Sequence, residues 1–130
     1  MRGIWRGLLA AIVALTLCAG TITTASAGGT VLDSYCGESG DFCTYVVEKD
    51  DGAIVFQIQA FANYFGRSEA CVTKDTRVCR SRSPHRDHGL FEWTIRWQAN
   101  YPDEGPGRYA VRWRSGNGGR IGPALHFERS

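Results

Sequence analysis

The chain has 130 residues, 43% of them hydrophobic and 22% charged, with 15 basic and 13 acidic side chains. This length leaves room for a single domain of ordinary size. Two of the basic residues, Arg2 and Arg6, precede the cleavage site predicted below, so residues 28–130 carry 13 charges of each sign and no net charge. This balance excludes a protein that seeks polyanions through its overall charge.

The first 27 residues are organised as a cleavable signal peptide. Two arginines precede an apolar run from Leu8 to Leu17, and the small residues Ala25-Ser26-Ala27 follow. Charged, apolar and small-residue regions in this order direct secretion, and the run is shorter than the roughly 20 residues that span a bilayer. We therefore predict a signal peptide at 1–27, a secreted domain at 28–130 and no transmembrane segment.

Lipid attachment at Cys18 is the alternative fate of this segment, and it is not favoured because the preceding Leu17 is not small.

Cleavage removes Cys18 and leaves four cysteines, Cys36, Cys43, Cys71 and Cys79. An even number in a short exported chain predicts two disulfides. Three connectivities are possible, and we favour the sequential pairs 36–43 and 71–79. Neither spacing is the Cys-x-x-Cys of a zinc site.

Beyond residue 28, apolar side chains recur at a spacing of two almost throughout, which predicts a nearly all-β domain. The first strands are expected at 30–35, 43–49 and 53–62, with Asp50-Asp51-Gly52 as a hairpin turn. That turn lacks the alternating oxygen ligands of a calcium loop.

A second hairpin is predicted between Cys71 and Cys79. Folding about Asp75 places Val72 opposite Val78 and the two cysteines opposite each other, within reach of a disulfide. Closing so short a loop stabilises the fold by roughly 2–3 kcal/mol. The residues that follow, 81–89, are expected to form a loop.

Three potential metal ligands, His85, Asp87 and His88, lie within four residues of that loop. Imidazoles three positions apart chelate a metal best on a helix, whereas these lie between Pro84 and Gly89. We therefore predict a solvated loop without a metal.

The alternation is clearest in the last 40 residues, where strands are predicted at 91–98, 108–114 and 121–128, separated by turn-rich segments. The inward positions are Phe91, Trp93, Ile95, Trp97, Tyr109, Val111, Trp113, Leu125 and Phe127. Because three tryptophans share this face, we expect them to pack in the core rather than to form a sugar-binding platform.

About seven short strands in a hundred residues predict a single antiparallel β-sandwich. The stretch Gly105-Pro-Gly-Arg-Tyr-Ala-Val-Arg-Trp113, with the closing strand after it, resembles the last two strands of small secreted immunoglobulin-like or fibronectin-III-like domains of high-GC bacteria. The resemblance implies that Tyr109 bonds back across the preceding corner. Val111 stands where antibody domains have their second cysteine, so the resemblance concerns architecture in the last third of the chain and supplies no function.

One candidate catalytic set lies on the polar face of the last strands: Glu92 as base, His126 as acid and Arg112 as phosphate clamp. Their types and order resemble small secreted microbial ribonucleases, which need all three within reach of one phosphate. That family also requires a helix packed on the sheet, and none is predicted. Cross-strand ion pairing explains the same pattern, so we expect neither an enzyme nor a cofactor.

The densest basic run contains Arg77, Arg80, Arg82 and Arg86. Arginine binds phosphate, sulfate and carboxylate groups in a bidentate manner. An anionic envelope polymer is therefore a candidate partner. An extracellular protein is another candidate, and no nucleotide is expected.

We predict a secreted, non-enzymatic binding module. The alternatives are a secreted inhibitor of an extracellular hydrolase, presenting Lys74-Asp75-Thr76, and then the ribonuclease-like hydrolase.

Overall fold

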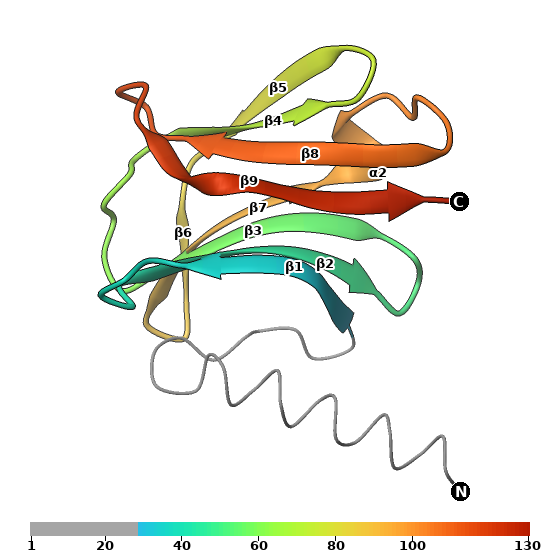
Figure 1. Ribbon diagram of the computed structural model, residues 1–130. Coiled ribbons are helices and arrows are strands. Elements are labelled where there is room, and N and C mark those ends of the chain that lie inside the picture. The colour runs from blue at the N-terminus through green and yellow to red at the C-terminus, as the bar shows by residue number, and fades with distance from the viewer. Residues whose placement is uncertain (1–28) are drawn as a thin grey trace, which may run out of the picture.

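The computed structural model describes residues 29–130, so the predicted signal peptide lies outside the described residues. Two antiparallel sheets pack face to face (Figure 1). The five-stranded sheet has the order β1 (Gly29–Cys36), β2 (Phe42–Lys49), β3 (Ile54–Ala60), β7 (Leu90–Arg96) and β6 (His85–Asp87). The four-stranded sheet has the order β5 (Arg77–Arg82), β4 (Ser68–Thr73), β8 (Gly107–Arg114) and β9 (Arg120–Arg129). The predicted all-β sandwich is confirmed. Within the described residues, no helix has the length and apolar character needed to cross a bilayer.

Both predicted hairpins are present. The turn between β2 and β3 is closed by a hydrogen bond from the Lys49 amide to the Ala53 carbonyl, 2.8 Å long, and Gly52 supplies the positive φ of 86° that glycine adopts most readily. In the second hairpin, Cys71 lies opposite Cys79 and Val72 opposite Val78. The sequential disulfides, Cys36–Cys43 and Cys71–Cys79, are both formed.

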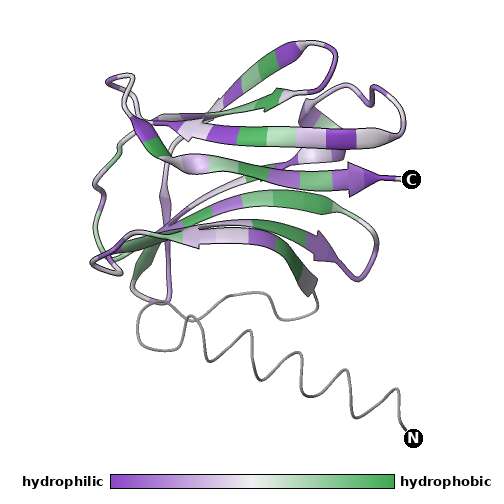
Figure 2. Ribbon diagram, in the orientation of Figure 1, coloured by the Kyte–Doolittle hydropathy of each residue, from purple (hydrophilic) through white to green (hydrophobic). Residues whose placement is uncertain are grey.

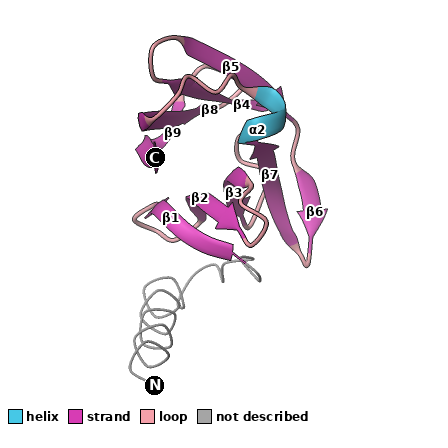
Figure 3. Ribbon diagram, turned by 90° about the vertical axis from the view of Figure 1, so that its right-hand side faces the viewer, coloured by secondary structure: helices cyan, strands magenta, loops and turns pink. Residues whose placement is uncertain are grey.

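The loop predicted at 81–89 and the end of the strand predicted at 91–98 are both wrong. Ser81 and Arg82 are the last residues of β5. Residues 85–87 form β6 on the edge of the five-stranded sheet, where a loop was expected, because they pair with Leu90–Glu92 through a tight turn. The strand expected at 91–98 ends at Arg96, and the short helix α2 (Trp97–Asn100) follows. A hydrogen bond from the Asn100 side chain to the Arg96 carbonyl, 2.7 Å long, closes this turn, which carries the chain from β7 toward the other sheet (Figure 3).

The core lies between the two sheets and is dominated by aromatic rings. Trp93, Trp97 and Trp113 are at most 2% exposed, so the prediction that they pack inside is confirmed. The ring of Phe127 stacks on Tyr109 with centroids 5.0 Å apart. Strongly hydrophilic residues are interspersed with apolar ones along β8 and β9 (Figure 2), and the buried positions of β8 are two residues apart, as expected for a strand with one face in the core.

Two tyrosine hydroxyls tie loops to this core. Tyr109 donates to the Gly105 carbonyl over 2.7 Å and accepts from the Glu104 amide over 2.9 Å, which is the bond across the corner expected at the start of β8. Tyr101, which follows α2, donates to the Ala70 carbonyl in β4 over 2.6 Å. The segment between β7 and β8 is thus held at both of its ends.

The buried phenol of Tyr101 predicts a loss of stability in alkali. Burial is the main cause that raises the pKa of Tyr101 far above its usual value. In the unfolded chain the phenol ionises near pH 10, so above this pH the unfolded state loses a proton that the folded state keeps. The free energy of unfolding is therefore expected to fall as the pH rises above about 10.

Urea titrations between neutral pH and pH 11 check this prediction, with Tyr101→Phe as the comparison. The variant loses about 1 kcal/mol at neutral pH with its hydrogen bond and shows a shallower alkaline decline. Equal declines in the two proteins would contradict the role of Tyr101.

Candidate anion-binding groove

The outer face of the four-stranded sheet carries a groove of about 320 Å³. Small side chains from three strands form its floor, namely Cys71, Thr73, Ala110 and Ala124. Four arginines line it, Arg77 from β5, Arg112 and Arg114 from β8, and Arg120 from β9. We call these residues together the arginine groove.

The strand pattern explains why these arginines gather. Tyr109, Val111 and Trp113 are buried on the inner face of β8, so the alternation of a strand turns Arg112 and Arg114 outward. The backbone register then places Arg114 opposite Arg120 on β9, and Arg112 opposite Cys71 on β4. Arg77 joins them from β5, where it lies opposite Thr73.

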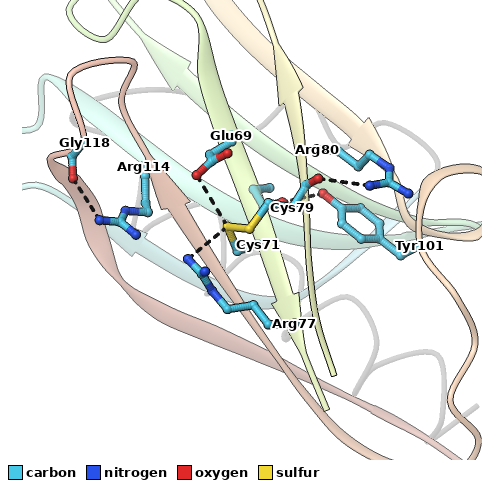
Figure 4. The surroundings of a disulfide bond; sticks show 9 residues. Glu69, Cys71, Arg77, Cys79, Arg80, Tyr101, Arg114 and Gly118 are labelled. Carbon is cyan, nitrogen blue, oxygen red and sulfur yellow. Dashed lines mark hydrogen bonds between the residues drawn. A yellow bond between two sulfur atoms is a disulfide. The ribbon is translucent and has the colours of Figure 1, made fainter. Parts of the chain in front are cut away.

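The four guanidinium groups have no ionic partner among the described residues. The ion pairs between residues 29 and 130 involve other basic side chains, such as Arg96 with Asp51 and Arg129 with Asp103. The groove arginines make weaker contacts: Arg77 Nη2 lies 3.5 Å from Cys71 Sγ, and Arg114 Nη2 lies 3.4 Å from the Gly118 carbonyl oxygen (Figure 4).

One carboxylate lies close to the groove. Glu69 is the β4 residue opposite Arg114, and its Oε1 is 3.8 Å from Cys71 Sγ (Figure 4). Four positive side chains around one negative neighbour leave a net positive potential over a floor of small residues. Such a surface is suited to phosphate, sulfate or carboxylate groups, which guanidinium binds with paired hydrogen bonds.

Of the basic run singled out from the sequence, only Arg77 belongs to the groove. Arg80 and Arg82 alternate with Cys79 and so face the other side of β5, where Arg82 Nη2 is 2.8 Å from Asn100 Oδ1. The guanidinium carbon of Arg86 lies 4.9 Å from the Phe91 ring centroid, on the other sheet. Arg114 and Arg120 were not among the sequence candidates, although the predicted inward position of Trp113 implies that its neighbour Arg114 points outward.

The predicted catalytic set does not assemble. Glu92 lies in β7, between β3 and β6 of the five-stranded sheet, whereas Arg112 and His126 lie in the other sheet. The three residues were predicted to lie together on the polar face of the last strands, and the sheet order contradicts this. Glu92 is only 5% exposed, accepts a 2.7 Å hydrogen bond from the Gln59 side chain, and lies 3.5 Å from His85.

A larger cavity, of about 620 Å³, contains His126 and opens between β9 and the β1–β2 pair. Charges of both signs line it, and several are already engaged. Asp33 accepts from the His126 amide over 2.8 Å, and Arg129 lies 2.6 Å from Asp103. This cavity therefore lacks the uncommitted charges of one sign that distinguish the arginine groove.

The tip of the β4–β5 hairpin, which the inhibitor alternative would present to a target, makes contacts with neighbouring side chains. Lys74 has a side chain only 18% exposed, and its Nζ lies 3.4 Å from Asp75 and 5.9 Å from the Tyr109 ring centroid. Thr76 donates its hydroxyl to Glu104 over 2.9 Å. These contacts hold the tip against the loop that precedes β8.

The histidine segment does not converge on one point. His88 Nδ1 lies 2.7 Å from Asp87, while His85 faces Glu92. Among residues 29–130, the potential metal-ligand atoms that lie within 4.8 Å of one another belong to Glu69, Cys71 and Cys79, and the disulfide occupies both sulfurs.

No family model, curated protein or solved structure matches the chain.

Proposed function

We propose that this protein is a secreted, non-enzymatic binding module that captures an anionic polymer through the arginine groove. The observation that carries the proposal is the convergence of four arginines without ionic partners on one groove. Holding like charges together on a sheet costs free energy unless a ligand neutralises them. An anionic group placed over the floor relieves this repulsion and forms charge-assisted hydrogen bonds.

A polymer suits the groove better than a small anion. The arginines come from three strands of the sheet and lie on its outer surface rather than in a closed cavity. Repeating charges along a chain reach several guanidinium groups at once. Because residues 28–130 have no net charge, binding depends on this local patch and is expected to weaken as salt screens it.

The strand order supports an immunoglobulin-like scaffold for this module. The strands β2-β3-β7-β6 and β4-β8-β9 have the neighbours of strands ABED and CFG in constant-type immunoglobulin domains, with β1 and β5 added at the edges. The Tyr109 bond to the corner before β8 is a second shared feature. Rigid sandwiches of this kind carry binding surfaces in many secreted proteins.

Chromatography on heparin resin tests the proposal, because heparin carries both sulfate and carboxylate groups. The disulfide-bonded wild type is expected to bind at low salt and to elute as salt rises. The double variant Arg112→Gln, Arg120→Gln should bind at least about tenfold more weakly, since it loses two charge-assisted contacts.

A matched control removes the same charge elsewhere. Arg86→Gln with Arg96→Gln changes two exposed arginines of the five-stranded sheet, and this protein should elute with the wild type. Equal weakening by the two double variants, or flow-through of the wild type at low salt, would contradict the proposal.

A further inference from the structure

The two disulfides form a matched pair in backbone geometry. Each joins directly opposed residues of an antiparallel hairpin, with Cα atoms 4.0 Å apart and sequence separations of 7 and 8. In each pair one cysteine is buried, Cys43 at 0% and Cys71 at 3% exposure, and its partner is partly exposed. A difference in their reactivity must therefore come from their surroundings.

Those surroundings differ in charge. Cys43 belongs to a buried cluster with Tyr45 and Val47, against which Cys36 and Leu90 also pack. An apolar setting of this kind disfavours a thiolate.

The other disulfide borders the arginine groove (Figure 4). Arg77 Nη2 lies 3.5 Å from Cys71 Sγ, and Arg112 is the residue opposite Cys71 on β8. Glu69 opposes them at 3.8 Å, but the arginines outnumber it. A thiolate formed at Cys71 is therefore stabilised by its neighbours.

The positive charge beside Cys71 favours thiol–disulfide exchange in which Cys71 is the leaving group. An external thiolate attacks the Sγ of Cys79, the more exposed residue of the pair, and a new S–S bond joins the two sulfurs. The Cys71–Cys79 bond breaks, and its electron pair leaves with the Sγ of Cys71, beside Arg77. The products are a mixed disulfide on Cys79 and a thiolate on Cys71, which can return to expel the external thiol.

We propose that Cys71–Cys79 is a thiol-exchange site selective for anionic thiols, which forms a mixed disulfide at Cys79, while Cys36–Cys43 stays intact. The arginines that stabilise the leaving thiolate also attract a negatively charged attacking thiol. This inference goes beyond polymer binding and needs no polymer.

The wild type alone provides the first test. The oxidised protein is treated with one of three thiols at matched thiolate concentrations and low salt. Besides the thiol, 3-mercaptopropionate carries an anionic carboxylate, 2-mercaptoethanol a neutral hydroxyl and cysteamine a cationic ammonium group. Free thiols are then alkylated and located by peptide mass mapping. We expect Cys71 and Cys79 to react before the other pair, and the anionic thiol to react about tenfold faster than the cationic one, with the ratio falling as salt rises.

A second test compares two arginines of β5. Arg77→Gln should slow opening of Cys71–Cys79 about three- to tenfold, because the leaving thiolate loses its neighbour, and should reduce the preference for the anionic thiol. Arg80→Gln removes the same charge from the other face of the strand, near Tyr101 (Figure 4), and should leave both properties unchanged.

Three results would overturn the inference: opening of Cys36–Cys43 first or at the same rate, equal rates for the three thiols with the wild type, or equal effects of the two variants. The first two need no variant, so a variant that fails to fold leaves the test intact. Retention on heparin together with uniform thiol rates would contradict this site and leave the anion-binding proposal standing.

Discussion

Replacing Trp93 with alanine is expected to lower the free energy of unfolding by about 4 kcal/mol, the largest loss for one side chain in this fold. The indole is fully buried, and its N–H donates to the Gly66 carbonyl over 2.7 Å. Its ring lies 5.7 Å from that of Phe65, between centroids. The substitution therefore opens a cavity and also releases the segment between β3 and β4.

Urea denaturation followed by circular dichroism measures this loss, and Trp93→Phe separates its two causes. Phenylalanine keeps most of the buried ring but cannot donate to Gly66, so a loss of about 1–2 kcal/mol is expected. A loss below about 1 kcal/mol for the alanine variant would show that Trp93 does not anchor the core.

Removal of the Cys36–Cys43 disulfide is expected to have the second largest effect. With both cysteines replaced by alanine, the unfolded chain regains the entropy of a short closed loop, which costs about 2.5 kcal/mol of stability. Burial of Cys43 at 0% exposure adds a packing loss. The variant should unfold at a lower urea concentration than the wild type.

The Cys71→Ala, Cys79→Ala variant is the internal control, because its loop is almost equally long. It should lose the entropic contribution but less packing, since Cys71 borders the arginine groove, whereas Cys36 and Cys43 pack in an apolar cluster with Tyr45 and Val47. A larger loss at this pair than at Cys36–Cys43 would contradict the ranking.

Much of this fold follows from local pattern. Directly opposed cysteines around Asp75 predicted a disulfide-closed hairpin, and the structure has that register. Alternation in β8 correctly placed Tyr109, Val111 and Trp113 inside, because a strand with one face in the core repeats every two residues. Such features depend only on residues close together in the chain.

The order of strands within the sheets could not be predicted in this way. Glu92 was grouped with Arg112 and His126 because their strands looked adjacent, but β7 pairs with β3 and β6. Conversely, Arg77 and Arg120 line the same groove although 43 positions apart in the numbering. Proximity of this kind depends on pairing between distant segments, which single-strand periodicity does not encode.

Arg80 and Arg82 lie outside the groove, yet they have a consequence for assembly. β5 is an edge strand, with one side of its backbone unpaired within the described sheet, and unpaired edges can recruit another sheet and aggregate. Three of its six residues are arginines, and their mutual repulsion opposes the approach of a second copy along this edge. The opposite sheet ends in β6, only three residues long, which offers few backbone groups for pairing. The charge of β5 and the short length of β6 therefore oppose the addition of a strand from a second copy at these two edges.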